Sequence, residues 1–169
     1  LTSKKHKSGS DRVAEVARKT NFKWILNLQG DEPLINVNDV KRLINKTLIY
    51  NMKDNNFVAS TLFVKKKFYK NIKSEVKLII NKKNQVVKFT RKKIFFNNKY
   101  FYFKHVGIYL YKSNFLKTYS KLKRSKLEKM ENLEQLRILD NGFKIIAFEA
   151  KKDSIGIDTP QDLTKLRNI

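Results

Sequence analysis

The stretch WILNLQGDEPLINVNDVKRLINKTLIYN, residues 24–51, passes from an apolar run through a polar turn into a helical pattern. WILNL (24–28) predicts a short buried strand that ends at Gly30, and NVNDVKRLINKTLIYN (36–51) predicts the helix that follows it. A strand, a polar loop and a helix in this order are typical of an α/β domain. In open α/β sheets ligands bind at the carboxyl ends of strands, which is where Gln29, Asp31 and Glu32 would lie.

The acids of this loop have two interpretations. Asp31 and Glu32, followed by Pro33, either form a polar turn that caps the next helix or project a carboxylate into a cleft that holds Mg²⁺, a hard ion with oxygen ligands. Asp158 stands in a similar context in IGIDTPQDL (155–163), where it is also a good helix N-cap. The two roles can coexist, and two carboxylates that converge on a metal ion would suit nucleotidyl transfer.

Composition sets limits on the class of protein. The sequence has 169 residues, 41% of them hydrophobic, which predicts one folded domain over residues 1–169. No apolar run reaches the roughly 20 residues that cross a bilayer, so we expect a soluble, cytoplasmic protein. The absence of cysteine excludes disulfides and thiolate metal sites, and the two histidines, His6 and His105, are far apart in the sequence. Any metal site would therefore use oxygen ligands.

The charge is strongly positive. Lys and Arg total 38 against 15 Asp and Glu, a net charge of +23 that fits a protein binding nucleic acid or another polyanion. The lysines are scattered along the chain among many Asn, Ile, Phe and Tyr, which equally fits a compositional drift toward AT-rich codons. The pattern leaves a polyanion-binding module open as an alternative.

The rest of the chain predicts a mixed sheet with further helices. Helices are expected over residues 11–19, with Ser10 or Asp11 as N-cap, over 126–139, and over 158–169, with Pro160 at the first helical position. Strands are expected in 57–65, in 76–91 as two strands around a KKNQ turn, in 100–112 and in 145–150. The helix over 126–139 would end at DNG and would carry one apolar face, formed by Leu127, Met130, Leu133, Leu136 and Leu139.

Six motifs, taken in order, carry a resemblance to a known family. They are HKSGSDR (6–12), NLQGDEPLI (27–35), KFTRKKI (88–94), KHVGIYLY (104–111), LEKMENLEQLRILDNG (127–142) and IGIDTPQDL (155–163). Together they resemble the 3-deoxy-manno-octulosonate cytidylyltransferases, or CMP-Kdo synthetases, over essentially the whole chain. The resemblance implies a Rossmann-like nucleotide-diphospho-sugar transferase fold, an α/β sandwich with a mixed sheet, and a homodimer. It also implies the reaction CTP + Kdo → CMP-Kdo + pyrophosphate, which serves lipopolysaccharide synthesis.

The resemblance also assigns roles to residues. Asp31 and Asp158 would be catalytic and would ligate Mg²⁺. The CTP site would draw on the HKSGSDR segment, with Ser10 in place of the family's usual threonine, and the sugar-acid site on later motifs. The CTP candidates are Ser8, Gly9, Ser10, Arg12 and Gln29, and the sugar-acid candidates are Gln29, Arg91, His105, Tyr109, Glu134 and Gln135. CTP and Kdo would then be the partners, rather than a membrane or a nucleic acid.

The sequence departs from the family pattern at its start. The family begins with a strand and a loop of the type IPAR…R…GK that holds the triphosphate, and this sequence starts after them, at Leu1. We therefore expect a fold that lacks its N-terminal strand and triphosphate loop, and a chain that by itself binds CTP weakly and turns over poorly. Within enzymes, the alternative is a cytidylyltransferase for another sugar acid, such as a sialic acid or an amino-Kdo.

Overall fold

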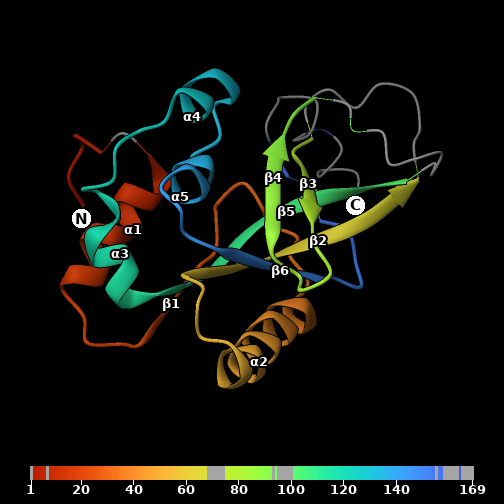
Figure 1. The fold of residues 1–169 in the computed structure, drawn as a ribbon, viewed down its shortest axis with the longest axis horizontal. Helices are drawn as coiled ribbons and strands as arrows, with labels where there is room; N and C mark the ends of the chain where they lie inside the picture. The colour runs from red at the N-terminus through yellow and green to blue at the C-terminus, as the bar shows by residue number, and fades with distance from the viewer. Residues whose placement is uncertain are drawn as a thin grey trace.

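The sheet is built around its longest strand, β5 (Phe101–Lys112). The computed structural model describes residues 2–6, 8–67, 75–92, 94, 101–154, 156–157 and 164, so the helix expected from Asp158 onward lies outside the described residues. The other strands are β1 (Trp24–Asn27), β2 (Ala59–Lys67), β3 (Lys77–Ile80), β4 (Val86–Thr90) and β6 (Ile145–Glu149). The helices are α1 (Gly9–Arg18), α2 (Val37–Lys53), α3 (Ser113–Tyr119), α4 (Lys126–Glu131) and α5 (Leu136–Asp140). Figure 1 shows the strands in the middle, with α2 on one side and α1 and α3 at one end.

The six strands form one mixed sheet, as the sequence predicted. Its order is β4-β3-β5-β2-β6, with β1 paired to β5 outside this path. β2 and β6 run parallel, and the other pairings are antiparallel. β2 follows β5 along one edge, while β3 and β1 pair with opposite ends of β5, at Phe103–Lys104 and Tyr109–Lys112. A stretch of β5 around Gly107 is therefore left between β3 and β1, and the site is built there.

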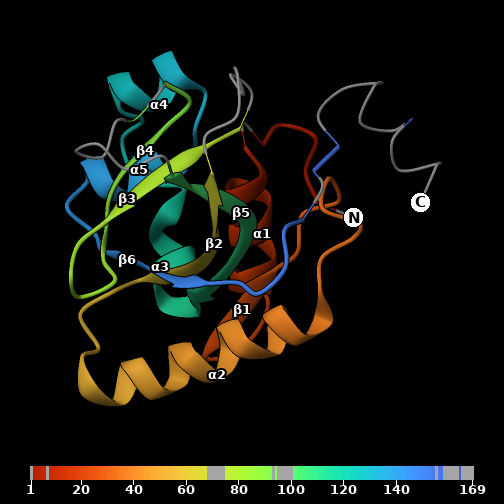
Figure 2. The same cartoon turned by 90° about the vertical axis from the view of Figure 1, so that its right-hand side faces the viewer.

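Side chains alternate between two apolar cores, one on each face of the sheet. On β5, Val106, Ile108 and Leu110 pack with Leu43 of α2, whereas Tyr109 and Tyr111 belong to the other core, with α1, α3 and α5. This alternation follows from the two-residue repeat of a strand. Figure 2 shows the result, a sheet with α2 on one side and α1 and α3 on the other. The expected α/β sandwich with a mixed sheet is confirmed.

Two helix expectations are wrong. Ser8, rather than Ser10 or Asp11, is the N-cap of α1, because its side chain accepts a hydrogen bond from the Asp11 amide. The helix expected over 126–139 is broken into α4 and α5, with Asn132 in the left-handed conformation at φ 52°. Leu127 and Met130 are consequently exposed and contribute nothing to the expected apolar face, while Leu133 and Leu136 are buried.

The break in the helix allows a buried ion pair. Glu128 and Arg137 are both almost fully buried, and two Arg137 nitrogens donate to the Glu128 carboxylate at 2.6–3.1 Å. In a continuous helix, residues nine positions apart point in opposite directions, about 180° from each other, so the pair could not form. Arg137 also donates to Asp11 of α1, at 3.1 Å. The network therefore fixes the relative position of α1, α4 and α5.

The other elements agree with the sequence within a few residues. The KKNQ turn joins β3 to β4, Asn36 caps α2, and α5 ends at DNG, where Gly142 has φ 81°. Because Asn36 is the cap of α2, the interpretation of Asp31 and Glu32 as caps of this helix is wrong. None of the described helices has the length and apolar character needed to cross a membrane.

Candidate active site

One face of β5 carries a row of rings that is interrupted by a glycine. The rings of Tyr109 and Tyr111 stack with centroids 5.3 Å apart, and His105 lies 5.4 Å from Tyr109. Phe89 of β4 continues the row at 5.2 Å from His105. Gly107 stands between His105 and Tyr109 and contributes no side chain. The row thus has an opening at the level of the backbone, between two of the predicted sugar-acid residues.

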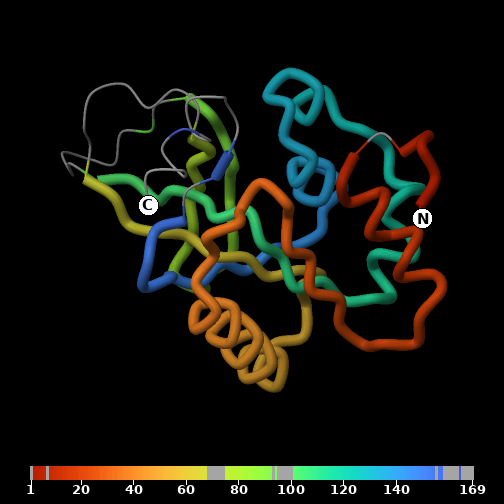
Figure 3. The backbone as a smooth tube through the Cα atoms, turned by 180° about the vertical axis from the view of Figure 1, so that it is seen from behind, coloured from red at the N-terminus to blue at the C-terminus, as the bar shows by residue number. Residues whose placement is uncertain are grey.

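The loop after β1 fills this opening. A Cβ atom on Gly107 would lie 3.4 Å from Glu32 Oε1 and 3.5 Å from Gln29 Oε1, and the Gly107 amide donates to Glu32 Oε1 at 3.2 Å. Seen from behind, this loop, drawn in orange, runs across the green strand β5 (Figure 3). Gln29 is therefore brought to the same face as His105 and Tyr109, as the resemblance implied.

The start of α1 meets the same face at Tyr111. Ser10 is buried, and its hydroxyl lies 3.3 Å from the Tyr111 hydroxyl. The Ser10 amide donates to Glu134 Oε2 at 3.0 Å. This amide at the start of α1 therefore already has a carboxylate of the same chain as its partner. A Cβ atom on Gly9 would lie 3.6 Å from the other Glu134 oxygen. A predicted CTP residue and a predicted sugar-acid residue are thus in direct contact.

The buried hydroxyl of Tyr109 forms no hydrogen bond of normal geometry with a described residue, although the Thr61 side chain is close enough to offset part of the effect of burial on its pKa. Burial, reinforced by Tyr111 and Glu134, raises the pKa of Tyr109 well above its ordinary value of 10, so the group stays protonated. A buried polar atom without a partner is unfavourable by about 1–3 kcal/mol, and native structures seldom keep one without a reason. The Tyr109 hydroxyl is therefore a donor for which a water molecule or a ligand would serve as partner.

His105 is a neutral imidazole in this site. Its Nε2 lies 3.1 Å from the Thr61 hydroxyl, which donates its one proton to the Ile108 carbonyl at 2.7 Å and lies 3.2 Å from the Val106 carbonyl oxygen, where the register between β2 and β5 shifts. Burial, together with the positive charge of Lys104, lowers the pKa of His105 to about 3. At neutral pH the ring therefore forms hydrogen bonds without carrying a charge.

Asp31 is exposed, and its side chain forms no hydrogen bond with a described residue in this structure. Its carbonyl accepts a hydrogen bond from the Ile157 amide at 2.8 Å, so the chain reaches the QGDEP loop one residue before Asp158. No group of three His, Asp, Glu or Cys side chains among the described residues forms a metal site by itself. An exposed carboxylate is nonetheless the type of oxygen ligand that Mg²⁺ takes.

The remaining predicted residues lie around this centre or outside the described part. Ser8 is engaged in capping α1, and Arg12 is exposed, with its guanidinium donating to Thr2 at 3.0 Å. Arg91 follows β4, and its amide donates to Glu131 of α4 at 3.1 Å. Gln135 is buried at the start of α5. Asp158, the second predicted metal ligand, lies outside the described residues.

Three residues of the site were not among the catalytic, CTP or sugar-acid candidates, although Glu32 was considered with Asp31 as a helix cap or an oxygen ligand. Glu32 binds the Gly107 amide, Thr61 binds His105, and Glu131 accepts hydrogen bonds from the Thr90 hydroxyl and the Arg91 amide, both at 3.1 Å. Glu32 stands next to a residue that was assigned, and its position in QGDEP was a signal. For Thr61 and Glu131 no local signal exists, because their partners are more than 35 residues away.

Comparison with known proteins gives a consistent result. A family model described as cytidylyltransferase matches residues 1–146. The chain is 41% identical to the 3-deoxy-manno-octulosonate cytidylyltransferase of Fusobacterium nucleatum over 99% of this chain and 69% of that protein. It is 38% identical to the protein of the same name from Francisella tularensis, over 100% of this chain and 72% of that protein.

Solved structures support the same family. CMP:2-keto-3-deoxy-manno-octonic acid synthetase, solved in complex with CTP, superposes with a TM-score of 0.84 at 35% identity, covering 99% of this chain and 69% of that chain. HddC from Yersinia pseudotuberculosis, at 17% identity and a TM-score of 0.67, shares the fold. With the resemblance in the motifs, the sequence identity and the superposition all in agreement, the chain belongs to the 3-deoxy-manno-octulosonate cytidylyltransferase family.

Proposed function

We propose that this protein is a nucleotidyltransferase that couples CTP to the sugar acid Kdo and releases pyrophosphate. The single observation that carries the proposal is the convergence of Gln29, His105 and Tyr109 on one face of β5, beside Tyr111, whose hydroxyl lies 3.3 Å from that of Ser10 in α1. Family membership supplies the substrates: the relatives are named for this reaction, and the solved relative binds CTP.

The reaction joins the anomeric hydroxyl of Kdo to the α-phosphorus of CTP. The hydroxyl oxygen attacks phosphorus and loses its proton to water, the bond from the α-phosphorus to the bridging oxygen breaks, and pyrophosphate leaves with that electron pair. Asp31 and Asp158 would hold Mg²⁺, which supplies charge neutralisation on the phosphates when it is bound. We assign no general base, and His105 is a poor one at neutral pH because its pKa is about 3.

The sugar acid brings a carboxylate that needs a cation. A neutral His105 cannot provide the charge, so its role is to orient a hydroxyl or carboxylate oxygen by hydrogen bonding. The protonated Tyr109 hydroxyl offers a second donor on the same face. Arg91 is the candidate cation. The hydrogen bond from the Arg91 backbone amide to Glu131 holds the turn after β4 beside α4. An arginine also matches the planar geometry of a carboxylate.

The decisive experiment measures pyrophosphate release by the full-length gene product from CTP, Kdo and Mg²⁺. The Asp31→Asn variant keeps the size of the side chain and removes its charge, and we expect it to lower turnover by about a hundredfold or more. Asp140→Asn changes an exposed carboxylate at the end of α5 in the same way and should leave the rate unchanged.

Each other result has a definite meaning. Pyrophosphate release with a sialic acid or amino-Kdo, but not with Kdo, would show that the protein is a cytidylyltransferase for that other sugar acid. Kdo-dependent release that survives Asp31→Asn would remove Asp31 from the metal site. No release with any sugar acid from a folded protein would overturn the proposed reaction.

A further inference from the structure

We infer that Glu32 is a positioning residue that holds residues 151–154 and 156–157 beside Asp31, rather than a ligand of the metal. The inference deepens the proposed function and rests on it for the role of Asp31. It starts from an asymmetry in the QGDEP loop. Asp31 is exposed and makes no side-chain hydrogen bond to a described residue, whereas both carboxylate oxygens of Glu32 are engaged by the protein.

The two oxygens of Glu32 hold two distant parts of the chain. Oε1 accepts the Gly107 amide of β5 at 3.2 Å, and Oε2 accepts the hydroxyl of Ser154. Ser154 is buried, with 2% of its surface exposed, so this hydrogen bond is shielded from water. Charged acceptors form the stronger hydrogen bonds. One side chain therefore ties the loop after β1 to the centre of the sheet and to the segment after β6.

The segment after β6 is held at successive points on its way to the site. Asp39 of α2, 2% exposed, accepts the amides of Lys151 and Lys152 at 2.9 and 3.1 Å. Asp153 then pairs with Lys66 at 2.9 Å and Lys104 at 2.7 Å.

Its last two contacts lie in the QGDEP loop. Ser154 binds Glu32, and the Ile157 amide donates to the Asp31 carbonyl at 2.8 Å. The segment thus passes from α2 to the loop carrying Asp31, and the Glu32 side chain provides the side-chain contact of the two that join it to this loop.

Close approach of the backbone makes this arrangement possible. At 3.4 Å from Glu32 Oε1, a Cβ atom on Gly107 would be in tight contact. At Gly156 the nearest atom to a Cβ would be the Asp31 carbonyl, at an ordinary 3.7 Å. Gly107 therefore leaves room for the Glu32 carboxylate against β5. With its oxygens directed to Gly107 and Ser154, the carboxylate acts on the position of the backbone around Asp31 and not on the Asp31 side chain.

The first test reads the position of the backbone and needs no metal. Hydrogen exchange is measured at the amides of Gly107 and Ile157 in the wild-type protein and in Glu32→Ala and Glu32→Gln. Glutamine keeps an oxygen acceptor for Gly107 and an amide group for Ser154, so we expect exchange close to wild type. Alanine removes both contacts, and we expect both amides to exchange at least about tenfold faster, because local opening becomes easier.

A matched control separates this role from general loosening of the segment. Asp39→Asn weakens the contacts at Lys151 and Lys152, at the other end of the same segment. We expect it to leave the exchange of Ile157 unchanged. Unchanged exchange of Ile157 in Glu32→Ala, or equal acceleration in Asp39→Asn, would overturn the positioning role of Glu32.

The second test asks whether metal binding needs the negative charge of Glu32, as a metal ligand would, or only its hydrogen bonds, as a positioning residue would. Mn²⁺ binding to the full-length protein, followed by electron paramagnetic resonance, should weaken about 10–100-fold in Glu32→Ala and stay within a few-fold of wild type in Glu32→Gln. Equal loss in both variants would show that the metal needs the charge of Glu32 and would overturn the proposal. A wild-type protein that binds no Mn²⁺ would instead contradict the metal role of Asp31, while hydrogen exchange still decides the role of Glu32.

Discussion

At the scale of single residues, the site combines groups that the sequence identifies with groups that only the fold reveals. Gln29 and Asp31 were predicted from a polar cluster after an apolar strand, which is a known ligand position, and the structure places both in the loop after β1. Thr61 could not be predicted, because it reads as one more β-branched residue in a strand, and its contact with His105 crosses 44 positions in the sequence. The neutral state of His105 was equally hidden, since it follows from burial beside Lys104.

The neutral state of His105 makes a prediction about pH. Its pKa is about 3 in the folded protein and near 6.5 when the chain is unfolded. Between these values the unfolded chain binds a proton that the folded protein does not, so stability falls as the pH drops below about 6.5. From pH 7 to 5 we expect this residue alone to lower the free energy of unfolding by about 2 kcal/mol.

The measurement is urea unfolding at pH 7 and pH 5, a window in which most carboxylates stay ionised. His105→Asn should lose less stability over this window than wild type, because asparagine does not titrate. His6→Asn removes the other histidine and shows whether the loss of any imidazole reduces the dependence of stability on pH. An identical pH dependence in wild type and His105→Asn would contradict the assigned neutral state.

At the scale of elements, alternation and turn chemistry predicted the strands, and tertiary contacts decided the helices. The hairpin of β3 and β4 and the long strand β5 follow from apolar alternation around the KKNQ turn and along 100–112. The 126–139 segment has a regular leucine spacing and still breaks at Asn132. The leucine spacing does not show which residues Arg137 contacts. The buried contacts of Arg137 with Glu128 and Asp11 stabilise the broken arrangement more than one continuous helix would be stabilised.

The buried network predicts an uneven response to two arginine substitutions. Arg137→Met leaves Glu128 buried without its main partner, and we expect a loss of about 3–5 kcal/mol in the free energy of unfolding. Arg124→Met removes a half-exposed partner of the same Glu128 oxygen, and we expect a loss below about 1 kcal/mol.

Chemical denaturation of both single variants, of Glu128→Gln and of Glu128→Gln with Arg137→Met gives the coupling energy of the buried pair. We expect the double variant to be less destabilised than the sum of the single ones, since no uncompensated charge remains at position 128. Similar losses for Arg137→Met and Arg124→Met would show that burial does not distinguish the two contacts.

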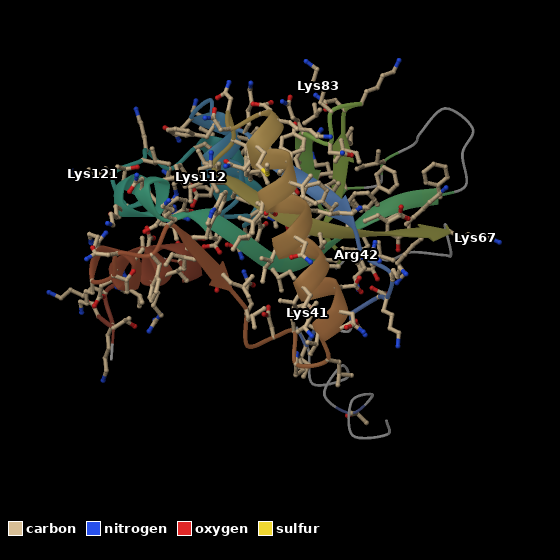
Figure 4. The ribbon with its side chains drawn as sticks, turned by 90° about the horizontal axis from the view of Figure 1, so that it is seen from below. Lys41, Arg42, Lys67, Lys83, Lys112 and Lys121 are labelled. Carbon is tan, nitrogen blue, oxygen red and sulfur yellow. The ribbon has the colours of Figure 1, made fainter. Side chains whose placement is uncertain are left out.

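At the scale of the whole molecule, the excess of positive charge is spread over the surface. Figure 4 labels Lys41 and Arg42, which are neighbours on α2, together with Lys67 at the end of β2, Lys83 in the turn between β3 and β4, and Lys112 and Lys121 at either end of α3. Nucleic-acid binding relies on cations gathered on one face or along one helix. The labelled cations come from four separate parts of the fold rather than from one helix, which fits compositional drift as the origin of the charge.

A dispersed net charge of +23 repels itself, and salt should relieve the repulsion. Raising the ionic strength from about 0.01 M to 0.15 M shortens the screening length from about 30 Å to about 8 Å, less than the separation of most surface charges. We therefore expect the melting temperature to rise with NaCl over this range, by about 2–4 °C for each kcal/mol of repulsion removed. Differential scanning calorimetry at several NaCl concentrations measures it.

A variant with less charge separates repulsion from other effects of salt. Lys41→Gln, Lys83→Gln and Lys121→Gln combined remove three exposed charges from three separate parts of the fold. This variant should melt above wild type at low salt and should approach it at high salt, because screening removes the difference between them. A melting temperature of the wild-type protein that is flat or falling with NaCl would mean that local ion pairs, such as those of Arg137 and Asp153, outweigh the net charge, since salt weakens attraction and repulsion alike.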